Sequence, residues 1–158
     1  MSVKLEADIQ VIWMLLFQIV ADIEKRIAAL IARHQLTPPQ FYVLKTLMEH
    51  GGSCPIGQIA REHHLTNATM TGLVKRLEIM QPPLVKREQS AHDRRSIMVS
   101  LTDAGLGRFE DVRDELMNHV KEMVTFLDEQ GRENLIEYAS FYVMQVVHKF
   151  PVSDVSQS

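Results

Sequence analysis

The chain has 158 residues, of which 46% are hydrophobic and 23% charged, and its formal net charge at pH 7 is −3. This composition excludes an intrinsically disordered chain, and the length predicts one globular domain with a core of its own. The single cysteine, Cys54, excludes an internal disulfide bond and favours a reducing, intracellular setting.

Residues 5–33 predict one long helix, because neither Pro nor Gly interrupts them and strong helix formers dominate. The first half of this helix is apolar on almost every side, so it must be covered on most of its surface. Its apolar run, residues 11–21, is about half as long as a membrane-spanning helix, and Asp8 and Asp22 flank it. We therefore expect no membrane segment, no secretory signal and a cytoplasmic protein.

Three shorter helices with tight connections are predicted next. Thr37 is the expected N-cap of the first, which has a proline at its first position and ends at Gly51 and Gly52. Pro55 opens the second helix, and Thr66 caps the third. The residues expected to face inward are Phe41, Leu44, Leu47, Met48, Ile56, Ile59, Ala60, Met70, Leu73, Val74 and Leu77. The last two helices, separated by a few residues, predict a helix-turn-helix.

Two strands are predicted after these helices, at residues 84–88 and 96–101. The second strand alternates, so that Ile97, Val99 and Leu101 fall on one side. The polar residues between the strands, about 89–95, are too many for a two-residue turn. This pattern predicts a hairpin with a long loop, the element known as a wing.

Two helices complete the predicted chain. Thr102 is the expected cap of an acidic helix over about 103–128, and Gly131 is expected to separate it from the last helix. Residues 138–150 have the same apolar character as the first helix. Because both end helices need cover, we expect them to pack together and against a second copy, forming an obligate homodimer.

Positive charge is concentrated in the middle of the chain. Residues 61–95 hold seven basic residues against four acidic ones, a local charge of +3, whereas residues 102–150 hold five against ten. A polyanionic partner responds to the local field rather than to the overall isoelectric point. The charge pattern therefore favours a nucleic acid as the partner of the middle segment.

The stretch from Leu36 to Gly105 resembles the MarR family of bacterial winged-helix transcription regulators. The resemblance is carried by LTPPQFYVL, IGQIAREHHL, TNATMTGLVKRLE, LVKRE and DRRSIMVSLTDAG, in this order. It implies a mainly α fold with a small β wing (α+β). The expected organisation is an N-terminal dimerisation helix at 1–36, a winged helix-turn-helix DNA-binding domain at 37–101, C-terminal helices completing the dimerisation region at 102–150, and a polar tail at 151–158.

The resemblance also implies a function. Members of the family act as homodimers on a pseudo-palindromic double-stranded DNA operator, usually as repressors, and release it when a small aromatic or phenolic compound, an oxidant or a metal binds. This chain departs from the family at IMQPPLV, where Pro82 and Pro83 replace the usual glycine and lengthen the link to the wing.

Two alternatives remain beside a repressor released by a small effector: a winged-helix adaptor for protein interactions without DNA binding, and a metal- or redox-responsive regulator of the same fold. The proline pair is the best argument for the adaptor. An enzyme is not expected, since we find no Gly-rich phosphate loop, nucleophile motif or catalytic dyad. We expect no cofactor.

The third short helix offers short polar and long basic side chains of the kind that contact DNA in the major groove. The candidates there are Thr66, Asn67, Thr69, Thr71, Lys75 and Arg76. The alternative is that Thr66 only caps the helix and the two cations are only solvated.

At the wing tip, Asp93 is positioned to orient Arg95 by a charge-assisted pair. Family analogy favours Arg95 as the side chain that enters the minor groove, with Arg94 as a further phosphate or groove contact. Lys86 and Arg87, on the strand before the tip, are candidate phosphate contacts. The alternative is an exposed turn with an unimportant ion pair.

The resemblance places an effector pocket between the dimer helices and the winged domain. Residues of this chain that could line it are Trp13, Phe17, His34, Phe41 and Arg87, an apolar wall with a cationic handle for an aromatic acid. The alternative is that the three aromatic residues are ordinary core.

Redox and metal sensing have weaker support. Cys54 lies near a helix start that could lower its pKa, but related redox sensors carry their reactive cysteine in the first helix, so a buried, inert thiol is favoured. Glu62, His63 and His64 lack the spacing of metal ligands on a helix, and no metal site is expected.

Overall fold

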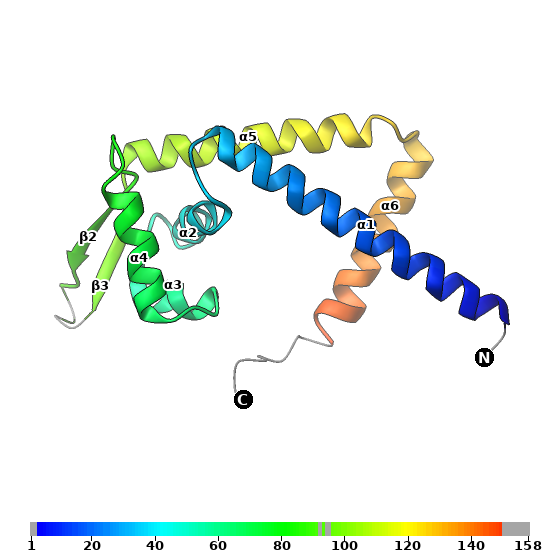
Figure 1. The fold of residues 1–158 in the computed structure, drawn as a ribbon, viewed down its shortest axis with the longest axis horizontal. Helices are drawn as coiled ribbons and strands as arrows, with labels where there is room; N and C mark the ends of the chain where they lie inside the picture. The colour runs from blue at the N-terminus through cyan, green and yellow to red at the C-terminus, as the bar shows by residue number, and fades with distance from the viewer. Residues whose placement is uncertain (1–2, 92, 94–95, 150–158) are drawn as a thin grey trace. The chain divides into compact units, whose positions relative to one another are not determined.

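The computed structural model describes residues 3–91, 93 and 96–149 (Figure 1). The chain divides into two units, the first ending at Leu116 and the second beginning at Met117. The first unit contains α1 (Val3–Arg33), α2 (Pro38–Glu49), β1 (Ser53–Pro55), α3 (Ile56–Glu62), α4 (Asn67–Glu78), β2 (Val85–Gln89), β3 (Ile97–Leu101) and the beginning of α5 (Asp103–Val124). The second contains the rest of α5, α6 (Glu129–Tyr142) and a π-helical turn at Val143–Val147. The expected mainly α fold with a small antiparallel sheet is confirmed.

The predicted helix starts are present where the sequence indicated them. Thr37 is the N-cap of α2, and its backbone N–H donates to Oε1 of Gln40 at 2.9 Å. The hydroxyl of Thr66 accepts from the backbone N–H of Thr69 at 3.2 Å and caps α4. Thr102 accepts likewise from the N–H of Gly105 at 3.0 Å at the start of α5. Each cap satisfies a donor that the helix leaves unpaired.

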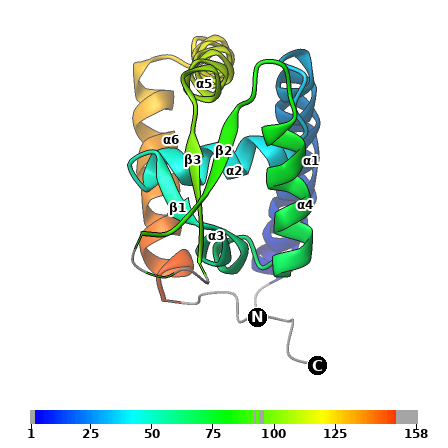
Figure 2. The same cartoon turned by 90° about the vertical axis from the view of Figure 1, so that its left-hand side faces the viewer.

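The sheet has three antiparallel strands in the order β1-β3-β2 (Figure 2). The two predicted wing strands pair directly, with Arg87 opposite Val99 and Gln89 opposite Ile97. The third strand, β1, was not predicted. It is only three residues long and ends in Pro55, so it carries no alternating pattern, and its place in the sheet depends on pairing with β3.

A single apolar core holds the winged part of the first unit together. Its fully buried side chains come from the C-terminal part of α1, from α2, α3, α4, the sheet and α5. They include Ile31, Val43, Leu44, Leu47, Ile59, Met70, Val74, Leu77, Val85, Val99 and Val112. The inward faces predicted for α2, α3 and α4 are therefore correct in outline. In contrast, α1 buries only Leu30 and Ile31 within this chain, and its apolar first half is exposed.

The junction between α5 and α6 differs from the expectation. Helix α5 ends at Val124 rather than near residue 128, and α6 begins at Glu129. Asp128 is the N-cap, with Oδ1 accepting from the N–H of Gly131 at 2.7 Å. Gly131 thus lies inside the first turn of α6, and its predicted role as the separator is wrong, because the capping aspartate determines where the helix begins.

The apolar run of α1, residues 11–21, is the part of the chain that most resembles a membrane segment. None of the helices in the described ranges is long and apolar enough to cross a membrane.

Candidate nucleic-acid interface

Helix α4 has one buried face and one exposed polar face. Met70, Val74 and Leu77 are completely buried, which fixes the rotation of the helix against the core. The rest of the helix surface carries the exposed side chains of Asn67, Thr69, Thr71, Lys75 and Arg76. Because the apolar side is held by packing, these polar side chains are presented together on a rigid element. Five of the predicted contact residues therefore share one solvent-facing surface.

The hydroxyl groups on this surface are already engaged within the helix. Thr66 Oγ1 and Thr69 Oγ1 lie 2.9 Å apart, in addition to the cap at the Thr69 N–H. Thr71 Oγ1 donates to the backbone carbonyl of Asn67 at 2.7 Å. A hydroxyl has one proton but two lone pairs, so Thr71 retains acceptor capacity and its methyl group rather than a free donor.

Three side chains of α4 stand free for an external partner. Within the part of the chain that the structure describes, those of Asn67, Lys75 and Arg76 form no side-chain hydrogen bond or ion pair. All three are exposed. They provide an amide that can donate and accept and two cations without a local counter-charge.

Arg61 adds a third exposed cation beside α4. A Cβ atom built on Gly57 would lie 3.7 Å from Arg61 Nη1 and 4.0 Å from Asn67 Oδ1, so the two side chains flank the same glycine. Arg61 belongs to the basic segment 61–95 but is not among the predicted contact residues. Its position on α3 gave no hint that the turn would bring it next to the start of α4.

The two cations of β2 are paired within the chain. Lys86 Nζ lies 2.9 Å from Glu88 Oε1, and both side chains are exposed. Arg87 Nε donates to Glu78 Oε2 at 2.9 Å, and Nη2 lies 2.7 Å from the same oxygen. The guanidinium of Arg87, a predicted phosphate contact, is thus paired with the last residue of α4.

The wing tip is only partly described. Arg94 and Arg95 lie outside the described residues. Asp93 is exposed; its carbonyl accepts from the N–H of Ser96 at 2.9 Å, and its own N–H is 3.4 Å from Ser90 Oγ. Pairing continues beyond β2 and β3 through the Ser90 N–H, which donates to the Ser96 carbonyl at 2.9 Å.

The unusual proline-containing link is anchored at its far end. The N–H of Leu84 donates to the carbonyl of Leu77 at 3.0 Å, and Leu84 is buried. Thr102 Oγ1 donates to the carbonyl of Pro83 at 2.6 Å, and the Thr102 N–H donates to the carbonyl of Leu84 at 3.1 Å. These bonds tie the link to α4 on one side and to the start of α5 on the other. The strand β2 follows directly and packs beside α4 (Figure 2).

The structure does not gather the five predicted effector-site residues. Trp13 and Phe17 form an aromatic pair with ring centroids 4.5 Å apart, and they are 64% and 59% exposed in this chain. Phe41 is buried in the core, stacked on Phe109 at 5.6 Å. An α-helix rises about 1.5 Å per residue along its axis. His34, which follows the end of α1, therefore lies roughly 30 Å from Trp13 along the axis of that helix.

His34 belongs to a polar cluster at the end of α1. Its Nε2 is 2.6 Å from Glu115 Oε2, and Arg33 Nη1 is 2.5 Å from Glu115 Oε1. Arg108 donates to the carbonyl of His34. The hydrogen bond from His34, followed by that from Arg33, lowers the pKa of the Glu115 carboxyl. The cluster links α1 to α5 within the first unit.

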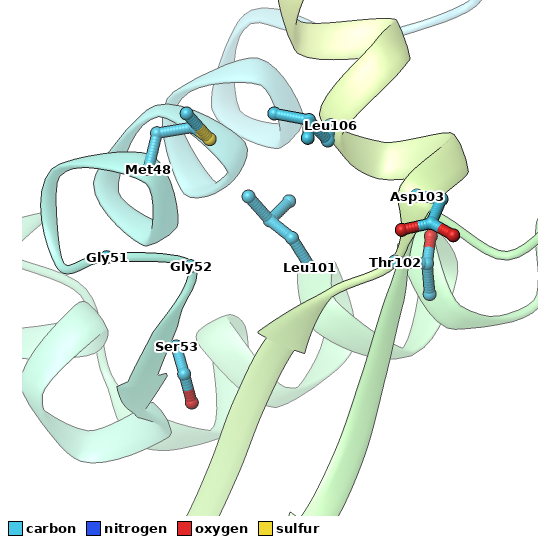
Figure 3. A pocket seen from close by; sticks show the side chains of 8 residues that line it. All are labelled: Met48, Gly51, Gly52, Ser53, Leu101, Thr102, Asp103 and Leu106. Carbon is cyan, nitrogen blue, oxygen red and sulfur yellow. The ribbon is translucent and has the colours of Figure 1, made fainter.

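A hollow of about 540 Å³ lies at the base of the sheet (Figure 3). It is lined by the end of α2 and the turn after it, by the end of β3, and by the start of α5, where Met48, Leu101 and Leu106 converge. None of Trp13, Phe17, His34, Phe41 and Arg87 lines it. The predicted effector residues and this hollow are therefore separate features.

Cys54 is buried, and His63 and His50 contact polar side chains of the same domain. Cys54 is the middle residue of β1 and 1% exposed, and burial raises the pKa of its thiol. The suggestion that a helix start lowers this pKa is wrong, because desolvation is the larger effect. His63 Nε2 lies 2.8 Å from Thr46 Oγ1, and His50 Nε2 lies 2.9 Å from Glu62 Oε1. Among the described residues no group of three possible ligands could hold a metal ion.

The buried face of α4, its exposed polar face and the adjacent strand pair define a winged helix-turn-helix domain. Comparison with known proteins gives the family. The model of the MarR family matches residues 36–97. The transcriptional repressor MdtR of Bacillus subtilis (strain 168) is 32% identical over 127 residues, which cover 80% of this chain and 78% of MdtR. The chain therefore belongs to the MarR family, and it is a transcriptional regulator rather than an enzyme.

Solved structures have the same fold. The crystal structure of YusO from Bacillus subtilis aligns with a TM-score of 0.75 at 28% identity, covering 92% of this chain and 100% of YusO. A variant of MepR from S. aureus, solved bound to an oligodeoxyribonucleotide, aligns with a TM-score of 0.64 at 21% identity, covering 84% of this chain and 96% of MepR. The second likeness concerns the fold alone.

Proposed function

We propose that this chain is a homodimeric repressor that binds a pseudo-palindromic double-stranded DNA operator in the cytoplasm. The observation that carries the proposal is the exposed face of α4, on which Asn67, Lys75 and Arg76 have no partner within the described chain. A helix of this width fits the major groove, and its side chains reach base edges and phosphates. The names of the relatives, a repressor among them, support the same direction.

Each side chain of α4 has a chemical role in this proposal. Asn67 can pair with an adenine edge, and Lys75 and Arg76 neutralise phosphates or read guanine. Thr66 and Thr69 hold the helix start and offer their remaining lone pairs, whereas Thr71 offers its methyl group to thymine. We add Arg61 as a phosphate contact, because it is exposed beside Asn67.

The wing is the second part of the proposed interface. Arg95 enters the minor groove with Asp93 as its orienting carboxylate, and Arg94 contacts a phosphate or the groove. Lys86 remains a phosphate contact, since its pair with Glu88 is exposed and such pairs are weak.

The proposed dimer is supported by apolar surface that one chain leaves uncovered. Large side chains from Ile9 to Val20 on α1, and from Leu135 to Val147 in the second unit, are exposed. A monomer rarely exposes a continuous apolar surface of this kind. A second copy of the chain is the occupant we propose, with residues 1–36 and 102–150 as the dimerisation segments around the DNA-binding domain 37–101.

We further propose a small aromatic or phenolic effector, on weaker support. Trp13 and Phe17 adjoin, whereas His34 lies about 30 Å from Trp13 along α1, so a site that uses these three would need residues from both copies. Trp13 is the chain's single tryptophan, and its fluorescence would report binding directly.

The wing and the repressor function are tested together by a gel-shift assay. The probe is a duplex from the region upstream of the chain's own coding sequence. The double variant Arg94→Ala with Arg95→Ala should lose binding while remaining a folded dimer. The control, Lys4→Ala with Lys25→Ala, removes the same charge from α1 and should bind as the unmodified protein does. Tight binding by the wing variant would sink the wing assignment, and no binding by any form would favour an adaptor without DNA binding.

A further inference from the structure

The pair between Glu78 and Arg87 bridges the recognition helix and the wing. Glu78 is the last residue of α4, and Arg87 is the middle residue of β2. Arg87 Nε donates to Glu78 Oε2 at 2.9 Å, and Arg87 Nη2 lies 2.7 Å from the same oxygen. One charge-assisted hydrogen bond and a second guanidinium nitrogen close to the same oxygen restrict where the guanidinium can lie.

The pair is shielded from solvent more than the neighbouring pair of Lys86 and Glu88 on β2. Its side chains are 32% and 30% exposed, against 57% and 61% for Lys86 and Glu88. Partial burial makes an ion pair less sensitive to salt, and it makes loss of one partner costly, because the remaining charge stays desolvated.

The pair adds to the hydrogen bonds that hold residues 79–84, the link between α4 and β2. The end of residues 79–84 is held by backbone hydrogen bonds of Leu84, by its buried side chain and by the Thr102 hydroxyl, which donates to the Pro83 carbonyl. Beyond this link, β2 is held along its length by pairing with β3, which in turn pairs with β1. The pair of Glu78 and Arg87 attaches β2 to the end of α4 at a further point, two residues beyond Val85, the first residue of the strand. The pairing with β3 fixes β2 within the sheet, and the Glu78–Arg87 pair adds a direct side-chain link from the sheet to the end of α4.

We propose that Glu78 and Arg87 form a positioning pair that sets the angle between the recognition helix and the wing. This rests on the proposed DNA-binding function. Arg87 thus acts on operator affinity through Glu78 and not as a phosphate contact. The carboxylate of Glu78 also stays neutralised next to a surface that approaches phosphates, which an unpaired acid would repel.

The direction of the Glu78→Gln effect separates this proposal from a phosphate contact at Arg87. If Arg87 contacted phosphate, Glu78→Gln would remove a competing acid and strengthen binding. As a positioning pair, Glu78→Gln should weaken binding roughly fivefold although it removes a negative charge from the interface. Arg87→Gln should weaken binding by a similar factor, and the double variant should be no weaker than either single one.

Binding is measured by fluorescence anisotropy on the upstream duplex at several salt concentrations. Lys75→Ala provides the reference for a direct contact and should reduce the salt slope by about one. Glu78→Gln and Arg87→Gln should leave that slope unchanged. The matched control is Glu49→Gln, which breaks the exposed pair with Lys45 on α2 by the same charge change and should leave affinity unchanged. Tighter binding by Glu78→Gln, or a reduced slope for Arg87→Gln, would overturn the proposal.

A second measurement works without DNA. In the free protein, amide hydrogen exchange over residues 85–89 should become faster in Glu78→Gln and not in Glu49→Gln. Unchanged exchange in that segment would contradict the positioning role even if no form of the chain bound DNA. If exchange rises but the unmodified protein binds no duplex, the pair positions the wing and the proposed repressor function is wrong.

Discussion

At the scale of single residues, His63 illustrates how burial determines charge. It follows α3, and its Nε2 lies 2.8 Å from Thr46 Oγ1, a buried threonine of α2. Burial lowers the pKa of His63 below its ordinary value of 6.5. The folded protein therefore favours the neutral imidazole, whereas the unfolded chain takes up a proton at higher pH.

We predict that His63 makes the fold less stable in mild acid. Its contribution is fully present above pH 6.5 and decreases as the pH falls below that value. In denaturant titrations between about pH 7.5 and pH 5.5, the free energy of unfolding should fall less for His63→Gln than for the unmodified protein. Parallel curves for the two proteins would rule out this role.

Two acidic residues act in a lower and separate pH range. Hydrogen bonds from Gln58 and then from His50 lower the pKa of Glu62, and those from His34 and Arg33 lower the pKa of Glu115. A carboxyl whose pKa is lowered by folding stabilises the fold at pH values above its ordinary pKa. This stabilisation is lost as the pH falls below that pKa. Any stabilisation from these two groups is therefore lost only below about pH 4.5.

At the scale of elements, the start of α5 lies against the link to the wing. A Cβ atom at Gly105 would meet the carbonyl oxygen of Leu84 at 1.9 Å and its carbon at 2.9 Å. Both are backbone atoms, which cannot swing aside as the end of a flexible side chain can. We expect Gly105→Ala to lower the free energy of unfolding by about 3 kcal/mol, measured by denaturant titration.

Gly107 is the control for this substitution. It lies two residues further along α5, and a Cβ there would have no atom within 4 Å. Gly107→Ala should raise stability by about 0.5 to 1 kcal/mol, because alanine loses less backbone freedom in a helix. Equal effects of the two alanines would mean that α5 does not approach Leu84 as closely as described.

Elements with local signals were predictable from the sequence, and elements with distant causes were not. Thr37, Thr66 and Thr102 cap their helices as expected, because a cap is made by residues three apart. Strand β1 was missed, since only its pairing with β3 makes it a strand. The predicted boundary at Gly131 is wrong. A glycine alone indicates a break in a helix, but the capping side chain of Asp128 places Gly131 inside the first turn of α6.

The candidate site shows the same division. The apolar spacing of α4 predicts its buried face, and Asn67, Lys75 and Arg76 are exposed, as contact residues must be. The pairing of Arg87 with Glu78 was not predicted, because it joins two elements across the link between them. Phe41 was chosen for an effector pocket, but aromatic residues in a helix do not reveal from sequence whether they line a pocket or fill the core.

At the scale of the whole molecule, the exposed apolar side chains in the first half of α1 favour burial against a partner. Leu16 lies within it, exposed beside Trp13 and Phe17. We predict that Leu16→Glu breaks the homodimer, because a carboxylate in an apolar interface is desolvated without a counter-charge. Light scattering should then give a mass near the 18.1 kDa of one chain instead of twice that value.

The control adds the same charge at a polar position of the same helix, Gln18→Glu, and should remain a dimer. An unmodified protein with the mass of one chain would refute the dimer, and so would a Leu16→Glu variant that stays dimeric at low micromolar concentration.

The central claim, that the α4 surface binds duplex DNA, is tested most directly by the salt dependence of binding. Affinity for the upstream duplex should fall steeply and linearly with salt on logarithmic axes, and Lys75→Ala with Arg76→Ala should weaken it and reduce the slope by about two. Binding no tighter than to an unrelated duplex, or a slope and affinity unchanged by this double variant, would contradict the claim.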